Sequence, residues 1–192
     1  RQMCIRDRYK GTRKPMDDAL RQQVPLMKEM LAAMGVCTIE MEGYEADDLL
    51  GTLAGMGERA GMEVSVVSGD RDLLQLATDH VRIRIPKTKR TGTEIEDYLA
   101  ADVKERYQVT PKEFIDVKAL MGDTSDNIPG VPSIGEKTAV KIIQQYNDIE
   151  NAIAHAAEIK PKKASENLAE FQEQARLSKF LATIIRDMPL EI

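Results

Sequence analysis

The sequence predicts an α/β fold that is followed by a helical region, and two patterns indicate this. Between residues 36 and 86, short apolar segments alternate with segments of helical periodicity, as in proteins built on a parallel sheet. Beyond residue 97 the apolar residues recur at helical spacing. We therefore expect the architecture to change near residues 95–110.

In the first half, apolar spacing and chain-breaking residues define the expected elements. Gly35 and Gly61 end two helical patterns, and Pro86 ends an alternating apolar segment. The segment EVSVVS has the composition of a buried strand. The expected elements are a helix at 15–34, a strand at 36–41, a helix at 45–60, a strand at 63–68, a short helix at 69–76 and a strand at 80–86.

In the second half, several segments have helical periodicity and we expect no strand. The expected helices are Tyr98–Tyr107, Pro111–Met121, Glu136–Tyr146, Asp148–Ala157 and a region over 162–186. The resulting organisation is an α/β core at 9–97 and a helical region at 98–192.

Composition excludes several classes of protein. No apolar run approaches the roughly 20 residues of a membrane span, so we expect no membrane association. The two cysteines form no C-x-x-C pair and the two histidines are far apart, which argues against zinc and favours a reducing cytoplasm. The net charge of −5 argues against indiscriminate coating of nucleic acid. We expect a monomeric, cytoplasmic protein.

Acidic residues are concentrated in three short segments. They are Glu45, Asp47 and Asp48 in GYEADDLL, Asp70 and Asp72 in SGDRDLL, and Asp123 and Asp126 in GDTSDN. The first two segments follow expected strands, and the carboxyl ends of parallel strands form one rim where ligands collect. For any one segment alone, helix capping is the simpler explanation.

A metal site explains the three acidic segments together. Each has a second acid two or three residues from the first, beyond what a helix cap needs, and such acids repel one another unless a cation lies between them. Oxygen ligands without His or Cys favour Mg²⁺ or Mn²⁺. Two such ions roughly 4 Å apart commonly serve phosphodiester cleavage.

The segment NIPGVPSIGEKTAVKII directly follows the third acidic segment. Gly130 and Gly135 flank a tight turn, and Gly135 opens a helix whose first N–H groups can meet an anion. Lys137 and Thr138 add a charge and a hydroxyl at the same end. This arrangement suits a sequence-independent grip on a DNA backbone, although an ordinary helix–helix connector has the same glycine spacing.

Basic residues form three runs that are separate from the acidic segments. The runs are Lys10, Arg13 and Lys14; Arg82, Arg84, Lys87, Lys89 and Arg90; and Lys160, Lys162 and Lys163. A solvated surface is the default interpretation of any one run. Their separation from the carboxylates suits a protein that follows a phosphate backbone beside a metal centre.

Several motifs closely resemble one family, the 5′-nuclease domains of bacterial DNA polymerase I and the wider flap endonucleases. The motifs are YKGTR, GYEADDLLGTLA, VVSGDRDLLQL, ALMGDTSDNIPGVPSIGEKTA and LSKFLATI, in the family's order over residues 9–192. The resemblance implies a PIN-like parallel sheet core and a helix-hairpin-helix at about 120–157. It also implies 5′-flap cleavage and 5′→3′ exonuclease action on DNA or RNA primers in replication and repair.

The resemblance also implies roles for individual residues. It implies that Lys10 and Arg13 lie over the scissile phosphate. It places Glu45, Asp47 and Asp48 around a first metal ion, and Asp70, Asp72 and Asp126, with Asp123 beside them, around a second. It implies that Gly130, Val131, Ser133, Gly135, Lys137 and Thr138 hold DNA, where the family often also binds a monovalent cation such as K⁺.

The chain departs from the family pattern at its start. Family members carry a strand ending in a metal-binding Asp, and then a second Asp, well before the YKGTR motif, whereas residues 1–8 (RQMCIRDR) do not match that lead-in. We expect a truncated fragment in which residues 1–8 are artefactual and the first metal site is incomplete.

Two alternatives to a nuclease stay open. One is a structure-specific DNA-binding module without catalysis. The other is an α/β phosphatase acting on small phosphoesters, which would leave the turn and the basic runs without a role.

Overall fold

The computed structural model describes residues 10–11, 15–90 and 92–190 of the chain. Its sheet has the strand order β1-β2-β3, with β1 at Val64–Val67, β2 at Val81–Lys89 and β3 at Gly92–Tyr98. β1 and β2 are parallel, with Val64 opposite Val81. β2 and β3 are antiparallel, with Ile83 opposite Tyr98. The α/β class is confirmed, but the sheet of the described residues is mixed rather than parallel throughout.

β3 was not expected from the sequence, and its composition explains why. Most of the strand is exposed and polar, so it lacks the apolar alternation that marks a half-buried strand. Its acids instead face the basic run of β2. Arg84 pairs with Asp97 at 2.9 Å, Lys87 pairs with Glu96 at 2.5 Å, and Lys89 pairs with Glu94. Three of the five basic residues in this run are therefore paired with acids across the sheet.

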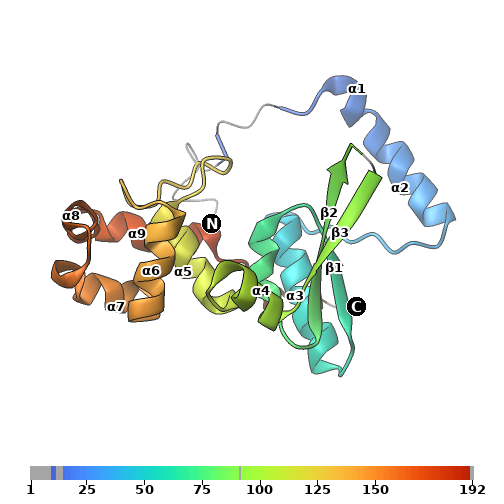
Figure 1. Ribbon diagram of the computed structural model, residues 1–192. Helices are drawn as coiled ribbons and strands as arrows, with labels where there is room; N and C mark the ends of the chain where they lie inside the picture. The colour runs from blue at the N-terminus through green and yellow to red at the C-terminus, as the bar shows by residue number, and fades with distance from the viewer. Residues whose placement is uncertain (1–9, 12–14, 91, 191–192) are drawn as a thin grey trace.

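The helix α3 (Ala46–Arg59) and the short 3-10 helix η1 (Arg71–Leu76) confirm two expected elements and pack beside the sheet (Figure 1). α3 packs closely because it carries small residues on its buried face. A Cβ on Gly57 would lie 2.8 Å from Val64 of β1, and a Cβ on Gly51 would lie 2.7 Å from Ile184. Because these glycines have no side chain, α3 can pack closely against the sheet and against the C-terminal segment.

The helical region is built around α5 (Pro111–Met121), which contacts η1, α6 and α9. Thr110 and Glu113 form a capping box at its start, and Gly122 ends it. The other elements here are α4 (Ala100–Tyr107), α6 (Glu136–Tyr146), α7 (Ile149–Ala154), the 3-10 helix η2 (Ala156–Glu158), α8 (Lys162–Glu170) and α9 (Gln172–Ala182). One hydrophobic core runs from the sheet into this region, so the two parts are packed as one body.

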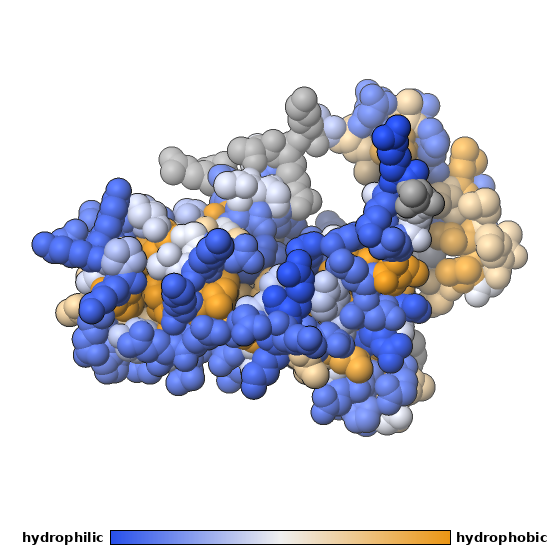
Figure 2. All heavy atoms as spheres, in the orientation of Figure 1, coloured by the Kyte–Doolittle hydropathy of each residue, from blue (hydrophilic) through white to orange (hydrophobic). Residues whose placement is uncertain are grey.

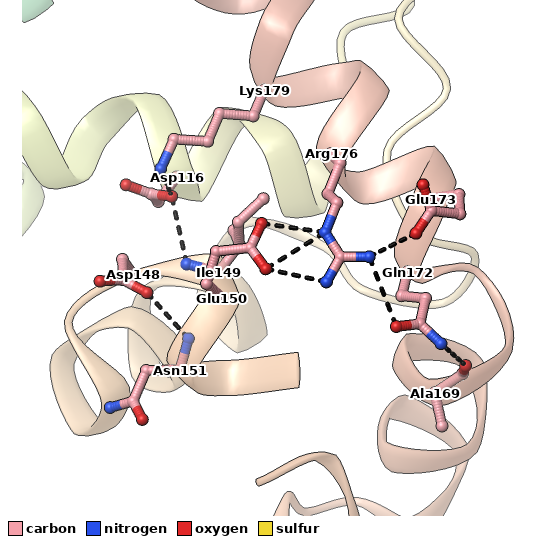
Figure 3. Close-up of polar contacts among 10 residues, drawn as sticks. All are labelled: Asp116, Asp148, Ile149, Glu150, Asn151, Ala169, Gln172, Glu173, Arg176 and Lys179. Carbon is pink, nitrogen blue, oxygen red and sulfur yellow. Dashed lines mark hydrogen bonds and ion pairs between the residues drawn. The ribbon is translucent and has the colours of Figure 1, made fainter. Parts of the chain in front are cut away.

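A polar network joins α5, α7 and α9 (Figure 3). Asp116 of α5 is 3% exposed and accepts hydrogen bonds from Lys179 of α9 (2.6 Å) and from the N–H of Ile149 at the start of α7 (3.1 Å). On the surface, Arg176 of α9 binds the Glu150 carboxylate at 2.8–3.1 Å. These contacts anchor α9 to its neighbours.

The first described helices, α1 (Asp18–Arg21) and α2 (Gln23–Ala33), extend away from the body (Figure 1). The single helix expected at 15–34 is thus divided at Gln22. α2 exposes large apolar side chains, and Figure 2 shows this hydrophobic surface. The strand expected at 36–41 does not form: the segment has no regular secondary structure, and no described strand pairs with its backbone. None of the described helices is long and apolar enough to cross a membrane.

Candidate metal and nucleic-acid site

The three acidic segments lie at the junction of the sheet and the helical region. Glu45 is the N-cap of α3, Asp70 follows the end of β1, and Asp123 and Asp126 lie in the loop after α5. Asp70 also caps η1, since its carboxylate accepts the N–H of Asp72 at 2.9 Å. Capping and clustering therefore occur together, and the two explanations are not exclusive.

Lys10 connects the first acidic segment to the third. Its ammonium lies 2.5 Å from Glu45 and 3.9 Å from Asp126 Oδ2. Its backbone N–H also donates to the carbonyl of Asp126 at 2.9 Å. The structure thus brings Lys10 into contact with both acids. Arg13, the other residue expected over the scissile phosphate, lies outside the described residues, as does Lys14.

Lys118 connects the second acidic segment to the third. Its ammonium lies 2.7 Å from Asp72 Oδ1 and 2.6 Å from Asp123 Oδ2. Burial would lower the pKa of Lys118, but the two carboxylates outweigh burial and raise it. Lys118 is not among the site residues expected from the sequence. The available signal was its position in the last turn of a helix, five residues before Asp123.

The carboxylate of Asp47 shows that the first and second segments influence one another. Burial, followed by the negative charge of Asp70, raises its pKa to about 6, against a lowering effect of Lys10. The charges of Glu45 and Asp72 also contribute to this rise. Repulsion of this kind is what a divalent cation among oxygen ligands relieves.

Asp72 and Asp123 respond differently to the ammonium that they share. Burial raises the pKa of Asp72 despite the opposing effect of Lys118. Its Oδ1 is buried and lies 2.7 Å from the Lys118 ammonium. Burial also acts to raise the pKa of Asp123, but hydrogen bonds from Lys118 and Ser125 outweigh it and lower the value to about 2.

Asp48 is the most deeply buried of the seven acids, followed by Asp126, which is 6% exposed. Asp48 is 1% exposed, and its two carboxylate oxygens accept backbone N–H groups from Glu45 at 3.3 Å and from Ile185 at 2.8 Å. These contacts cap α3 and attach the C-terminal segment to it. Asp48 thus has a structural task that the resemblance alone did not suggest.

The acids provide the type of oxygen ligand that a divalent cation prefers, but they do not surround a single point as a complete coordination shell would. In the described part of the chain, no three His, Cys, Asp or Glu side chains are grouped closely enough to hold a metal ion. Lys10 and Lys118 instead lie among the carboxylates. The hard oxygen donors, the buried Asp72 oxygen and the raised pKa of Asp47 fit a cation such as Mg²⁺.

The turn after the acidic loop has an interior part and an exposed part. Gly130 and Val131 are buried, the latter 3% exposed, so they face the protein rather than a nucleic acid. Ser133, Gly135 and Lys137 are exposed, and Thr138 is partly so. Gly135 is the N-cap of α6 and has no capping side chain, so the first N–H groups of α6 point toward this exposed end.

Residues 2–108 match the family model for the 5′-3′ exonuclease N-terminal resolvase-like domain, and residues 109–192 match that for the 5′-3′ exonuclease C-terminal SAM fold. The chain is 51% identical to DNA polymerase I of Bacillus caldotenax over 184 residues and 48% identical to that of Bacillus subtilis (strain 168). Each match covers 96% of this chain and 21% of the relative.

Solved structures show the same similarity. T5 5′-exonuclease with bound zinc matches with a TM-score of 0.75 and 27% identity, over 92% of this chain and 67% of that one. A T5 flap endonuclease pseudo-enzyme–product complex with DNA and metal ions matches with a TM-score of 0.73 and 27% identity, over 91% and 66%. On the two family models and the two polymerase relatives, the chain belongs to the 5′-3′ exonuclease family.

Proposed function

We propose that the chain is a metal-dependent 5′→3′ exonuclease and 5′-flap endonuclease, the nuclease part of a DNA polymerase I. Its substrates are 5′-flap, nicked or gapped duplexes, including RNA primers, in replication and repair. The observation that carries the proposal is the meeting of the three acidic segments, linked through Lys10 and Lys118, next to the turn that leads into α6. The chain acts as a monomer in the bacterial cytoplasm.

In this proposal Glu45, Asp47, Asp70, Asp72, Asp123 and Asp126 hold Mg²⁺ or Mn²⁺. The bound ions would activate water and stabilise the leaving oxygen, so no nucleophilic side chain is needed. Asp48 supports the site from behind by fixing the start of α3. Lys10, with Arg13, pairs with the phosphate that is cut. Because Lys10 already contacts Glu45 and Asp126, it would place that phosphate against the acids.

The exposed end of the turn is proposed to hold the duplex. Ser133 and the first N–H groups of α6 would accept a backbone phosphate, and Lys137 and Thr138 would add a charge and a hydroxyl. We also propose that this turn binds a K⁺ ion. Since such contacts involve no base edges, the grip would be independent of sequence.

A non-catalytic DNA-binding module is the second candidate. The observation that favours it is the placement of the acids, which in the described residues form no group of three around a metal ion. One assay separates the candidates. A 5′-labelled flap duplex is incubated with the chain in Mg²⁺ or Mn²⁺, with a chelator as control.

The nuclease proposal expects cleavage near the flap junction that requires the metal and is abolished by Asp126→Ala. Asp79→Ala is the matched control, because Asp79 is exposed in the loop before β2. Flap binding that survives chelation, without cleavage in either metal, would establish the binding module. Absence of both binding and cleavage would refute both candidates.

A further inference from the structure

Gly130 is the residue at which the acidic loop and the turn touch. Its φ of +60° and its packing both require glycine. A Cβ on Gly130 would lie 2.4 Å from the backbone nitrogen of Gly122, the residue that precedes Asp123. The loop is closed by paired hydrogen bonds between Asp123 and Ile128, at 2.9 and 2.7 Å. The proposed metal ligands and the proposed DNA grip are therefore held backbone against backbone.

Two side chains of α9 hold the backbone of this glycine. Ser178 Oγ accepts the Gly130 N–H at 3.0 Å, and Gln174 Nε2 donates to the Gly130 carbonyl at 2.7 Å. Ser178 is 0% exposed and donates in turn to the Gln174 carbonyl at 2.8 Å. Both polar backbone groups of Gly130 are thus bound by residues more than 40 positions away in the sequence.

A third side chain holds the turn from α8. Asn167 Nδ2 donates to the carbonyl of Pro132 at 2.6 Å. α9 itself is anchored on α5 and α7 through Lys179 and Arg176, as Figure 3 shows. Because α9 is fixed on α5, the contacts of Ser178 and Gln174 also fix the position of Gly130 relative to α5. This helix carries Lys118 and leads into the acidic loop.

We propose that Ser178 and Gln174 are positioning residues that fix the distance between the DNA grip and the carboxylates. Simple satisfaction of a buried backbone would also require partners for Gly130. The positioning role is distinguished by location, because both side chains bind Gly130, the residue at which the acidic loop and the turn before α6 meet. The inference rests on the proposed function, because it assigns these residues to DNA handling rather than to stability alone.

The test uses the full chain with Ser178→Ala, Gln174→Leu and the double variant. Gln172→Leu is the matched control, because Gln172 lies on α9 but its side chain bonds to Ala169 and Arg176, not to the turn. Hydrogen exchange of the amides of 128–134 and binding of a flap duplex in chelator are measured for each. Neither readout needs a bound divalent metal.

If Ser178 and Gln174 position the turn, we expect the variants to show faster hydrogen exchange that is confined to residues 128–134. We also expect the Kd of the double variant for the flap duplex to rise about tenfold. Where cleavage is observed, its position should spread over neighbouring phosphates. Exchange and Kd values equal to those of Gln172→Leu would overturn the inference while leaving the proposed function intact. If the unmodified chain binds no flap duplex, the proposed function and this inference fall together.

Discussion

Replacing Gly130 with alanine tests the packing on which the site depends. The left-handed backbone conformation costs an alanine about 1–2 kcal/mol. The new Cβ would also lie 2.4–2.7 Å from three backbone atoms of Met121 and Gly122, which cannot move aside as a flexible side chain would. Forcing a methyl group into such a place costs about 1–3 kcal/mol more. We therefore expect Gly130→Ala to lower the free energy of unfolding by about 2–5 kcal/mol.

Gly61→Ala is the matched control for this prediction. Gly61 has a φ of +75° after the end of α3, but nothing lies within 4 Å of a Cβ placed there. It should therefore show the conformational cost alone, about 1–2 kcal/mol. Both variants are compared with the unmodified chain by urea denaturation. Equal losses in the two variants would show that the contact between Gly130 and Gly122 is not as close as the structure describes.

Three further predictions concern charged groups. Asp116→Ala should lower the free energy of unfolding by about 2–3 kcal/mol, because it leaves the buried Ile149 N–H without its acceptor, while Lys179, whose side chain is 36% exposed, can be solvated by water. Arg176→Gln, which breaks the exposed pair with Glu150, should cost at most about 1 kcal/mol, and urea denaturation giving similar losses would contradict this ranking. The lowered pKa of Asp123 means that its contribution is present above pH 3.8 and is lost as the pH falls toward 2. In chelator, the difference in unfolding free energy between the unmodified chain and Asp123→Asn should therefore shrink over that range, and a constant difference would refute the assignment.

Elements with a strong local signal could be predicted from the sequence. α5 has Pro111 in its first turn, a capping box from Thr110 and a terminal glycine, and each of these acts within a few residues. β3 could not be predicted, because its stability comes from pairing with β2 rather than from its own apolar pattern. The prediction of a strand at 36–41 was wrong for the opposite reason. The segment has a strand-like pattern, but a strand also needs a partner for its backbone hydrogen bonds.

The candidate site was predictable in outline but not in its contacts. In an α/β fold, the ends of strands and the starts of helices gather at one edge of the sheet. This topology predicts that Asp47 lies near Asp70. The task of Asp48 could not be inferred, because a cap and a metal ligand have the same spacing in sequence. Ser178 could not be inferred either, since a serine on an amphipathic helix carries no sign of a partner 48 residues earlier.

The lysines explain how this chain can bring its acids together at all. Burial first, and then the charges of the neighbouring acids, Asp70 foremost, raise the pKa of Asp47 to about 6, so a charged Asp47 is unfavourable among these carboxylates. Lys118 offsets part of that cost at Asp72 and Asp123, and Lys10 does so at Glu45 and Asp126. Lys118 lies on α5, which leads into the acidic loop, and the backbone N–H of Lys10 donates to the carbonyl of Asp126 in that loop. The residues that neutralise the acids are therefore positioned by the same backbone that positions the acids, so a shift of the loop would disturb both together.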